Sequence, residues 1–293
     1  MEEVDAIVDS GGRLISVDVS GGIECQSHLS GIPDLLLTFK DPDLVDDCSF
    51  HPCVRYARYE HDQVISFVPP DGNFQLMRYR IKRDSVNNFT PPLYCHSQWS
   101  IREDNNNIAT TSNSSDAIAD TTTTQKSSTG RIVLQVGVTS ASSLIFSASR
   151  GKGQPLTIED VAITIPFPKT VRTTADSCSV NMGSLVYDEA GKVVRWNIGK
   201  LDVTKKPQLQ GKFILDHPKA SPTGDDDKHS SSAASAPDVE HTAAPNLSIN
   251  WKIPLASVSG LSVSGLSVTG EVYRPYKGVR NITKSGMFQV RGG

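Results

Sequence analysis

The chain lacks long apolar runs, and its charges of opposite sign nearly cancel. No segment approaches the roughly 20 apolar residues that a membrane-spanning helix needs. Residues 1–20 hold acids and small polar residues in place of a signal-peptide pattern. The formal net charge is −3, so binding to nucleic acid or to an acidic membrane would require a local patch. We expect a cytoplasmic protein, peripheral to membranes, with no nucleic-acid partner.

Cysteine pairs and catalytic motifs are also scarce. The five cysteines form no CxxC pair, which indicates neither a disulfide framework nor a zinc knuckle. GxSxG, Walker, HExxH and GxGxxG patterns are missing. His51-Pro52-Cys53 offers one ligand pair without a second, and a rigid proline between strand residues explains it better. We predict a protein that is not an enzyme and needs no cofactor or metal. A hydrolase would require Ser, His and a carboxylate that converge in space.

Alternation of apolar and polar residues with a period of two is what the chain has in abundance. Such alternation predicts β-strands with one buried face. Turn residues such as Ser10-Gly11-Gly12, Pro69-Pro70-Asp71-Gly72 and Asp188-Glu189-Ala190-Gly191 separate the alternating sets, and helical periodicity is weak. Many short strands with punctuating turns predict an all-β sandwich. The predicted inward residues are Ile15, Val17 and Val19; Leu35, Leu37 and Phe39; Ile132, Leu134, Val136 and Val138; Val161, Ile163 and Ile165; and Leu247, Ile249, Trp251 and Ile253.

Two segments break this pattern. Residues 103–130 are rich in Asn, Thr and Ser, and residues 217–245 are rich in Ser, Ala, Pro and Asp. Neither holds enough apolar surface to offset the entropy of ordering, so both are predicted to be disordered surface loops. The acidic run Asp225-Asp226-Asp227 in the second loop is interpreted as solvated charge.

Four lysines offer a weak indication of contact with anionic lipid. Lys205, Lys206, Lys212 and Lys219 could form a basic patch that touches lipid headgroups. The alternative, which we favour, is an ordinary solvated loop and strand edge.

Two similar pentapeptides near the C-terminus predict an irregular strand. Residues 259–263 read SGLSV and residues 264–268 read SGLSV again, with the apolar positions changing from odd to even. A strand that changes face at a glycine suggests a β-bulge. The bulge would point Val263 and Leu266 to the same side.

The longest distinctive pattern runs from Phe50 to Arg80. The segments FHPCVR (50–55) and ISFVPPDGNFQLMRYR (65–80) resemble the signature of the mu homology domain of clathrin-adaptor medium subunits. LSGIPDL (29–35), SGL (259–261), YKGVR (276–280) and GMFQVR (286–291) extend the resemblance over most of the chain. The opening EEVDAI, the FHPC run and the KGVR segment are most similar to the mu subunit of adaptor protein complex 3.

The resemblance implies an elongated, immunoglobulin-like β-sandwich with two subdomains. Residues 1–98 and 256–293 would form subdomain A, which binds the signal. Residues 99–255 would form subdomain B, inserted into the first and carrying the two predicted loops.

The resemblance also implies a function. Members of the family bind YxxΦ tyrosine-based sorting signals in the cytosolic tails of membrane cargo, during vesicle-mediated transport towards lysosomes or vacuoles. The full-length protein would assemble with large and small adaptor subunits on Golgi or endosomal membranes and transport vesicles. The alternative is a structural or accessory-protein interaction module of the same fold that does not read tyrosine signals.

Site residues follow from the resemblance position by position. Arg280 matches the arginine that packs against the signal's tyrosine ring, and Val279 with its strand would pair with the peptide backbone. Val263 and Leu266 match residues that line the pocket for the Φ side chain. The alternative is that Val263 and Leu266 belong to the core and that Arg280 is a solvated strand residue.

Two positions differ from the plasma-membrane members of the family. Gln26 stands where those members have a basic residue near the tyrosine hydroxyl, and Gly278 stands where they have tryptophan. The family's aromatic residue and aspartate on the first strand would precede Met1, so the tyrosine pocket is predicted to be incomplete in the sequence as written.

Overall fold

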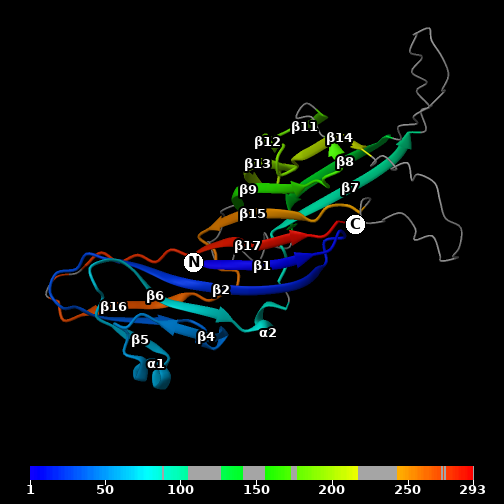
Figure 1. Cartoon of the computed structure of the whole chain (residues 1–293). Helices are drawn as coiled ribbons and strands as arrows, with labels where there is room; N and C mark the ends of the chain where they lie inside the picture. Colours follow the sequence, from blue (N-terminus) through cyan, green and yellow to red (C-terminus); the bar gives the residue numbers. More distant parts are fainter. Residues whose placement is uncertain are drawn as a thin grey trace, which may run out of the picture.

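The chain forms an elongated molecule built almost wholly of β-strands (Figure 1). The computed structural model describes residues 1–87, 89–104, 127–140, 156–172, 177–216, 243–271, 273 and 275–292. The prediction of an all-β sandwich is confirmed. In the part of the chain that is described, no helix is long and apolar enough to cross a membrane.

A nine-stranded sheet runs through the whole molecule. Its two central strands, β1 and β17, are parallel neighbours from opposite ends of the chain, with Glu2 opposite Thr283 and Val8 opposite Val290. In spatial order the strands are β12 (Ser184–Asp188), β13 (Val193–Asp202), β9 (Thr157–Pro166), β15 (Leu247–Pro254), β17 (Ile282–Val290), β1 (Glu2–Val8), β2 (Leu14–Ser27), β6 (Gly72–Ile81) and β4 (Val45–Phe50).

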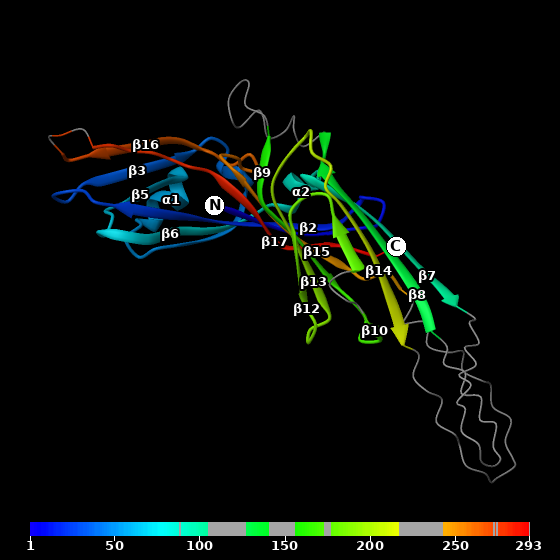
Figure 2. The same cartoon turned by 90° about the horizontal axis from the view of Figure 1, so that it is seen from above.

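Two smaller sheets lie at opposite ends of this shared sheet (Figures 1 and 2). The five-stranded sheet consists of β10 (Val171–Arg172), β14 (Gln208–Asp216), β8 (Ser127–Val138) and β7 (Leu93–Asp104), with β11 (Cys178–Val180) paired to β14. The three-stranded sheet consists of β16 (Val263–Thr269), β3 (Asp34–Phe39) and β5 (Val64–Phe67). Because the nine-stranded sheet serves both ends, the subdomain boundaries near residues 99 and 255 stay a prediction.

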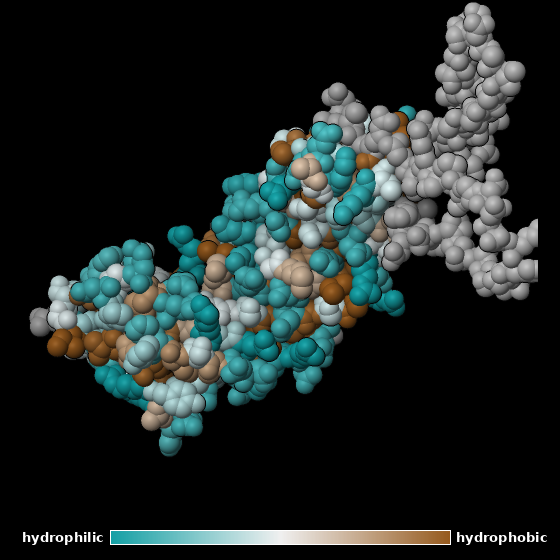
Figure 3. All heavy atoms as spheres, viewed as in Figure 1, coloured by the Kyte–Doolittle hydropathy of each residue, from teal (hydrophilic) through white to brown (hydrophobic). Residues whose placement is uncertain are grey.

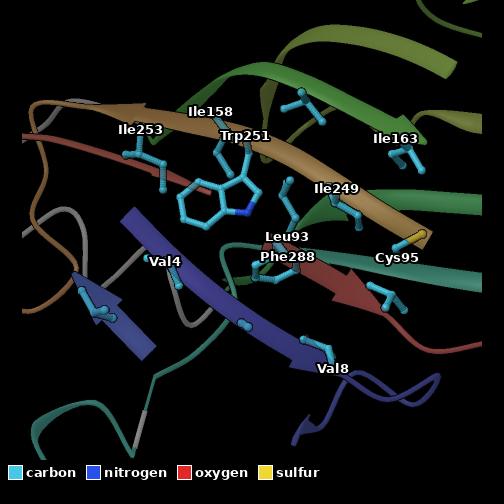
Figure 4. Close-up of a cluster of buried hydrophobic side chains, with 14 of the residues drawn as sticks. Val4, Val8, Leu93, Cys95, Ile158, Ile163, Ile249, Trp251, Ile253 and Phe288 are labelled. Carbon is cyan, nitrogen blue, oxygen red and sulfur yellow. The ribbon is translucent and has the colours of Figure 1, made fainter. Parts of the chain in front are cut away.

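The core forms where β7 packs across the shared sheet. Figure 4 shows Leu93 and Cys95 of β7 facing side chains of β1, β9, β15 and β17, with Trp251 in the centre. The inward residues predicted for β3, β8, β9 and β15 are buried, as alternation requires. The prediction for β2 is partly wrong, since Ile15 is 45% exposed while Val19 is fully buried. The register of β1 and β2 shifts here: Val8 pairs with Leu14 and Ile7 with Ser16, so Ile15 is the extra, unpaired residue of a bulge and does not follow the alternation.

Short helices were not predicted. A one-turn 3₁₀ helix η1 (Pro42–Leu44), α1 (Tyr56–Asp62) and α2 (Arg83–Val86) interrupt the strands. His51-Pro52-Cys53 forms a turn after β4 and not a strand: the Val54 amide donates to the His51 carbonyl at 3.0 Å, and the Cys53 amide to His51 Nδ1 at 3.2 Å. Proline suits this turn because its φ is fixed.

The first predicted loop is shorter than expected. β7 continues to Asp104 and β8 begins at Ser127, so residues 103, 104 and 127–130 belong to a paired ladder. The rest of that loop, and residues 217–242 of the second with Asp225-Asp226-Asp227, lie outside the described residues.

Candidate peptide-binding site

Strand β16 lies at one edge of the three-stranded sheet. It pairs with β3, and no other described strand pairs with it. The register shifts between Val263 and Gly265, which confirms the predicted bulge. Val263 and Leu266 are half-buried and pack against the core, whereas Ser264 and Ser267 are exposed. The bulge therefore turns both apolar residues to the same side of the strand, as expected.

Lys277 connects β16 to the segment that precedes β17. Its Nζ donates a hydrogen bond of 2.6 Å to the main-chain carbonyl of Leu266. This contact brings the segment 277–280 alongside the half-buried apolar residues of β16. Lys277 was not among the predicted site residues. A lysine amino group that bonds a distant carbonyl leaves no pattern in the sequence.

Gly278, Val279 and Arg280 are exposed and lead directly into β17. The strand expected around Val279 is not formed, because β17 begins at Ile282. No ion pair within the described residues engages Arg280, so its guanidinium is accessible to a ligand. Figure 3 shows hydrophobic residues, in brown, at the end of the molecule that carries β16.

Gln26 lies on the other side of β1 from Arg280. Glu2 pairs with Gly21 of β2 and with Thr283 of β17. β2 runs antiparallel to β1, so the chain of β2 passes Glu2 at Gly21 and continues past the N-terminal end of β1 to Gln26. β17 runs parallel to β1, so Arg280, which precedes β17, also lies past the N-terminal end of β1. The Gln26 side chain contacts His28, with 3.2 Å between the two Nε2 atoms. No contact that joins Gln26 to Arg280 occurs among the described residues.

A buried carboxylate holds the chain where it enters β16. Glu2 is 3% exposed. Its Oε2 accepts hydrogen bonds from the amides of Val258 at 2.7 Å and Ser259 at 3.2 Å. Its Oε1 accepts from the hydroxyls of Ser257 at 2.9 Å and Ser259 at 2.5 Å. These charge-assisted bonds fix residues 257–259, four residues before Val263.

Tyr79 completes the surroundings of Glu2. Burial, together with the neighbouring Glu2 carboxylate, raises the pKa of the Tyr79 phenol, which therefore stays protonated beside Glu2. The ring crosses β2 at Gly21, where an added Cβ would lie 2.3 Å from the Tyr79 ring. Any larger residue at position 21 would displace the phenol from the carboxylate.

The structure offers no metal centre in its described parts. No group of three or more His, Cys, Asp or Glu side chains there could hold an ion. The five cysteines, all within the described ranges, are free thiols.

Burial makes two of these thiols poor nucleophiles. Desolvation, with Cys53 nearby, raises the pKa of the Cys25 thiol to about 11, and burial raises the pKa of Cys95 to about 12. Because the thiolate is the reactive form, iodoacetamide at pH 7.5 should modify both more than about 100-fold more slowly than free cysteine. Modification should accelerate as the pH rises towards 11. Peptide mapping by mass spectrometry checks this, and a rate equal to that of free cysteine would refute it.

Three of the four lysines of the predicted patch lie within the described residues. Lys205 Nζ lies 3.5 Å from Asp202 Oδ2, which offsets its charge. Lys206 and Lys212 are exposed, and Lys219 lies outside the described residues. Contact of these lysines with lipid stays a prediction.

The arrangement of two sandwiches on one shared sheet defines the fold class. The structure is similar to a yeast delta-COP-I mu-homology domain, with a TM-score of 0.52 and 16% identity over 99% of this chain and 95% of that chain. It is also similar to a chain in a homology model of the full-length AP-3 complex, with a TM-score of 0.53 and 16% identity over 99% of this chain and 66% of that one. The chain therefore has the mu homology fold.

Comparison of the sequence with known proteins identifies the family of the chain. The model of the adaptor complexes medium subunit family matches residues 1–292, and the chain belongs to that family. It is 38% identical over 291 residues to the AP-3 complex subunit mu of Dictyostelium discoideum, and 35% identical to AP-3 complex subunit mu-1 of Rattus norvegicus. Each comparison covers 99% of this chain and 56% of the relative, so the chain spans about half the length of these relatives. The predicted likeness to mu subunits of adaptor protein complex 3 is confirmed.

Proposed function

We propose that the chain is a cargo-recognition domain that binds YxxΦ sorting signals in the cytosolic tails of membrane proteins. The observation that carries the proposal is the contact of Lys277, three residues before the exposed Arg280, with Leu266 on the strand that bears the same-side pair Val263 and Leu266. A short extended peptide could place its tyrosine on Arg280 and its Φ side chain on Val263 and Leu266. Membership of the adaptor medium subunit family supports this choice of ligand.

The chemistry of the two subsites is distinct. The planar guanidinium of Arg280 would stack on the tyrosine ring by a cation–π contact, which lysine makes less well. Val263 and Leu266 would bury the Φ side chain by the hydrophobic effect. Main-chain groups of residues 278–280 lie outside any strand and would order against the peptide backbone on binding.

In the cell, the proposed place of the domain is peripheral on Golgi or endosomal membranes and their vesicles. The full-length protein would join large and small adaptor subunits and serve transport towards lysosomes or vacuoles. Residues 1–98 with 256–293 would act as the signal-binding subdomain and residues 99–255 as the inserted one.

Arg280→Glu should weaken binding of a fluorescent YxxΦ peptide at least tenfold, because it removes a cation–π contact of up to about 2 kcal/mol and adds repulsion. A peptide with alanine in place of tyrosine should lose affinity similarly. Arg195→Glu, at an exposed position of β13, is the matched control. This variant should bind the peptide like the original chain. Fluorescence anisotropy measures all three. Equal affinity for the tyrosine and alanine peptides would refute the proposal.

A second candidate function rests on Gly278. This exposed glycine supplies no aromatic wall for a tyrosine, and Gln26 supplies no charge. These features favour an interaction module that binds an accessory or coat protein without reading tyrosine signals. Capture of adaptor subunits equally well by the original chain and by Arg280→Glu, with no peptide binding, would support it.

A further inference from the structure

The outer face of the five-stranded sheet carries a line of three cations at the opposite end of the molecule from β16. Arg102 of β7, Arg131 of β8 and Lys212 of β14 are all exposed. Neighbouring residues on these strands, such as Trp99, Ile132 and Phe213, point into the core. We call the surface of these three cations the basic face.

The strand register sets the spacing of the basic face. Lys212 pairs directly with Arg131, and Arg131 pairs with Ser100, two residues from Arg102 on the same face. Directly opposed side chains have Cβ atoms about 5 Å apart, and diagonal neighbours about 7 Å. The three cations thus cross three adjacent strands, with one direct step from Lys212 to Arg131 and one diagonal step from Arg131 to Arg102.

The charges of the basic face are not offset within the described residues. No ion pair or side-chain hydrogen bond there engages Arg102, Arg131 or Lys212. Other lysines of the molecule do pair, such as Lys200 with Glu159 at 3.0 Å and Lys284 with Glu3 at 2.7 Å. Directly opposed like charges destabilise a sheet. Among the described side chains these cations have no counter-charge, which is an electrostatic cost that an anionic partner would remove.

On the side of the cations away from Asp104 and Asp216, the cross-strand rows of this face carry no charge. One cross-strand row is Gln210, Val133 and Gln98, and the next is Gln208, Gln135 and His96. Glutamine amides donate and accept hydrogen bonds, which suits them to a peptide main chain. A narrow line of charge beside amide rows matches a linear ligand better than it matches a plane of lipid headgroups.

We propose that the basic face binds an extended acidic peptide with carboxylates at alternate positions. In an extended chain, side chains two residues apart are about 6.6 Å apart, close to the spacing of the three cations. Each of the two arginines can bind one carboxylate through two parallel hydrogen bonds. Lys212 can bind a third carboxylate through the charge of its amino group. The glutamines beside them would bond the peptide main chain. This site is separate from the site for tyrosine signals and does not depend on it.

Fluorescence anisotropy of a labelled peptide with the sequence SESESES tests the site on the complete chain. We expect saturable binding that weakens with added salt, and none by the matched SQSQSQS peptide. Arg131→Gln, at the centre of the line, should weaken binding about tenfold or more, since a charge-assisted bond is lost. Arg195→Gln, on the nine-stranded sheet of the same sandwich, should leave the affinity unchanged, and circular dichroism should show both variants folded.

Three results would overturn the proposal. The first is that the SESESES peptide does not bind at 50 mM salt. The second is that it binds the Arg131→Gln variant as well as the original chain. The third is that the peptide fails to bind, while vesicles with 20% phosphatidylserine bind the original chain and not the Arg131→Gln variant. The third result would assign the face to a membrane. Binding of YxxΦ peptides is a separate measurement, so failure of either proposal can be told from failure of the other.

Discussion

Glu2→Gln should lower the free energy of unfolding by about 3 kcal/mol, because it keeps the size of the side chain but removes its charge and one acceptor oxygen. The amides of Val258 and Ser259 and two hydroxyls converge on the carboxylate, which is itself buried. A glutamine NH₂ would face donors and leave at least one of them unpaired. Urea unfolding followed by tryptophan fluorescence measures the loss.

Glu3→Gln is the matched control for Glu2→Gln. The adjacent Glu3 makes an exposed ion pair with Lys284 at 2.7 Å. Exposed pairs contribute little, so the same substitution should cost less than about 1 kcal/mol. Equal losses at the two positions would contradict the role given to the buried carboxylate.

Trp251→Ala should cost about 3–5 kcal/mol, since it opens a cavity in the core between β7 and the strands β9, β15 and β17. Trp251 is 2% exposed and packs edge-on against Phe288, with ring centroids 5.9 Å apart. Figure 4 shows Trp251 at the centre of this cluster of buried side chains. Thermal unfolding by calorimetry should show a large drop in Tm.

Trp251→Phe and Trp196→Phe separate packing from hydrogen bonding. Trp251 Nε1 has no hydrogen-bond partner in the described part of the chain, whereas Trp196 Nε1 donates to the Met182 carbonyl at 2.8 Å. Both changes remove the same atoms, but only Trp196→Phe leaves an acceptor, the Met182 carbonyl, without its donor. Trp196→Phe should therefore cost about 1 kcal/mol more. The opposite order would contradict the hydrogen-bond assignment.

Alternation predicted the strands because a sheet with one buried face imposes a period of two on the sequence. Leu35, Leu37 and Phe39 show the rule directly, since all three are buried. The bulge at Gly265 was also predictable, because the apolar positions change parity there. α1 escaped prediction because Tyr59 is its one buried residue, which leaves no apolar stripe to detect.

Contacts between distant residues could not be predicted in the same way. Glu2 and Ser257 are 255 positions apart, and the parallel pairing of β1 with β17 that joins them is a property of topology. One signal was available: Val4, Ala6 and Val8 alternate inward, which places Glu2 on the buried face. A carboxylate at an inward position implies converging donors.

The proposed site for tyrosine signals stays a prediction, and only parts of its geometry followed from the sequence. The resemblance to medium subunits selected Val263, Leu266 and Arg280, and the bulge placed the first two on one side. The Lys277 contact depends on the path of the chain between β16 and β17, which carries no repeating pattern. The coil around Val279 shows that matching a family position does not fix its local conformation.

A crystal structure of the chain with a bound YxxΦ peptide tests the central claim most directly. We predict the tyrosine ring against the guanidinium of Arg280 and the Φ side chain against Val263 and Leu266, with the peptide beside residues 278–280. A peptide bound elsewhere, for example on the basic face, would contradict the assignment of this site.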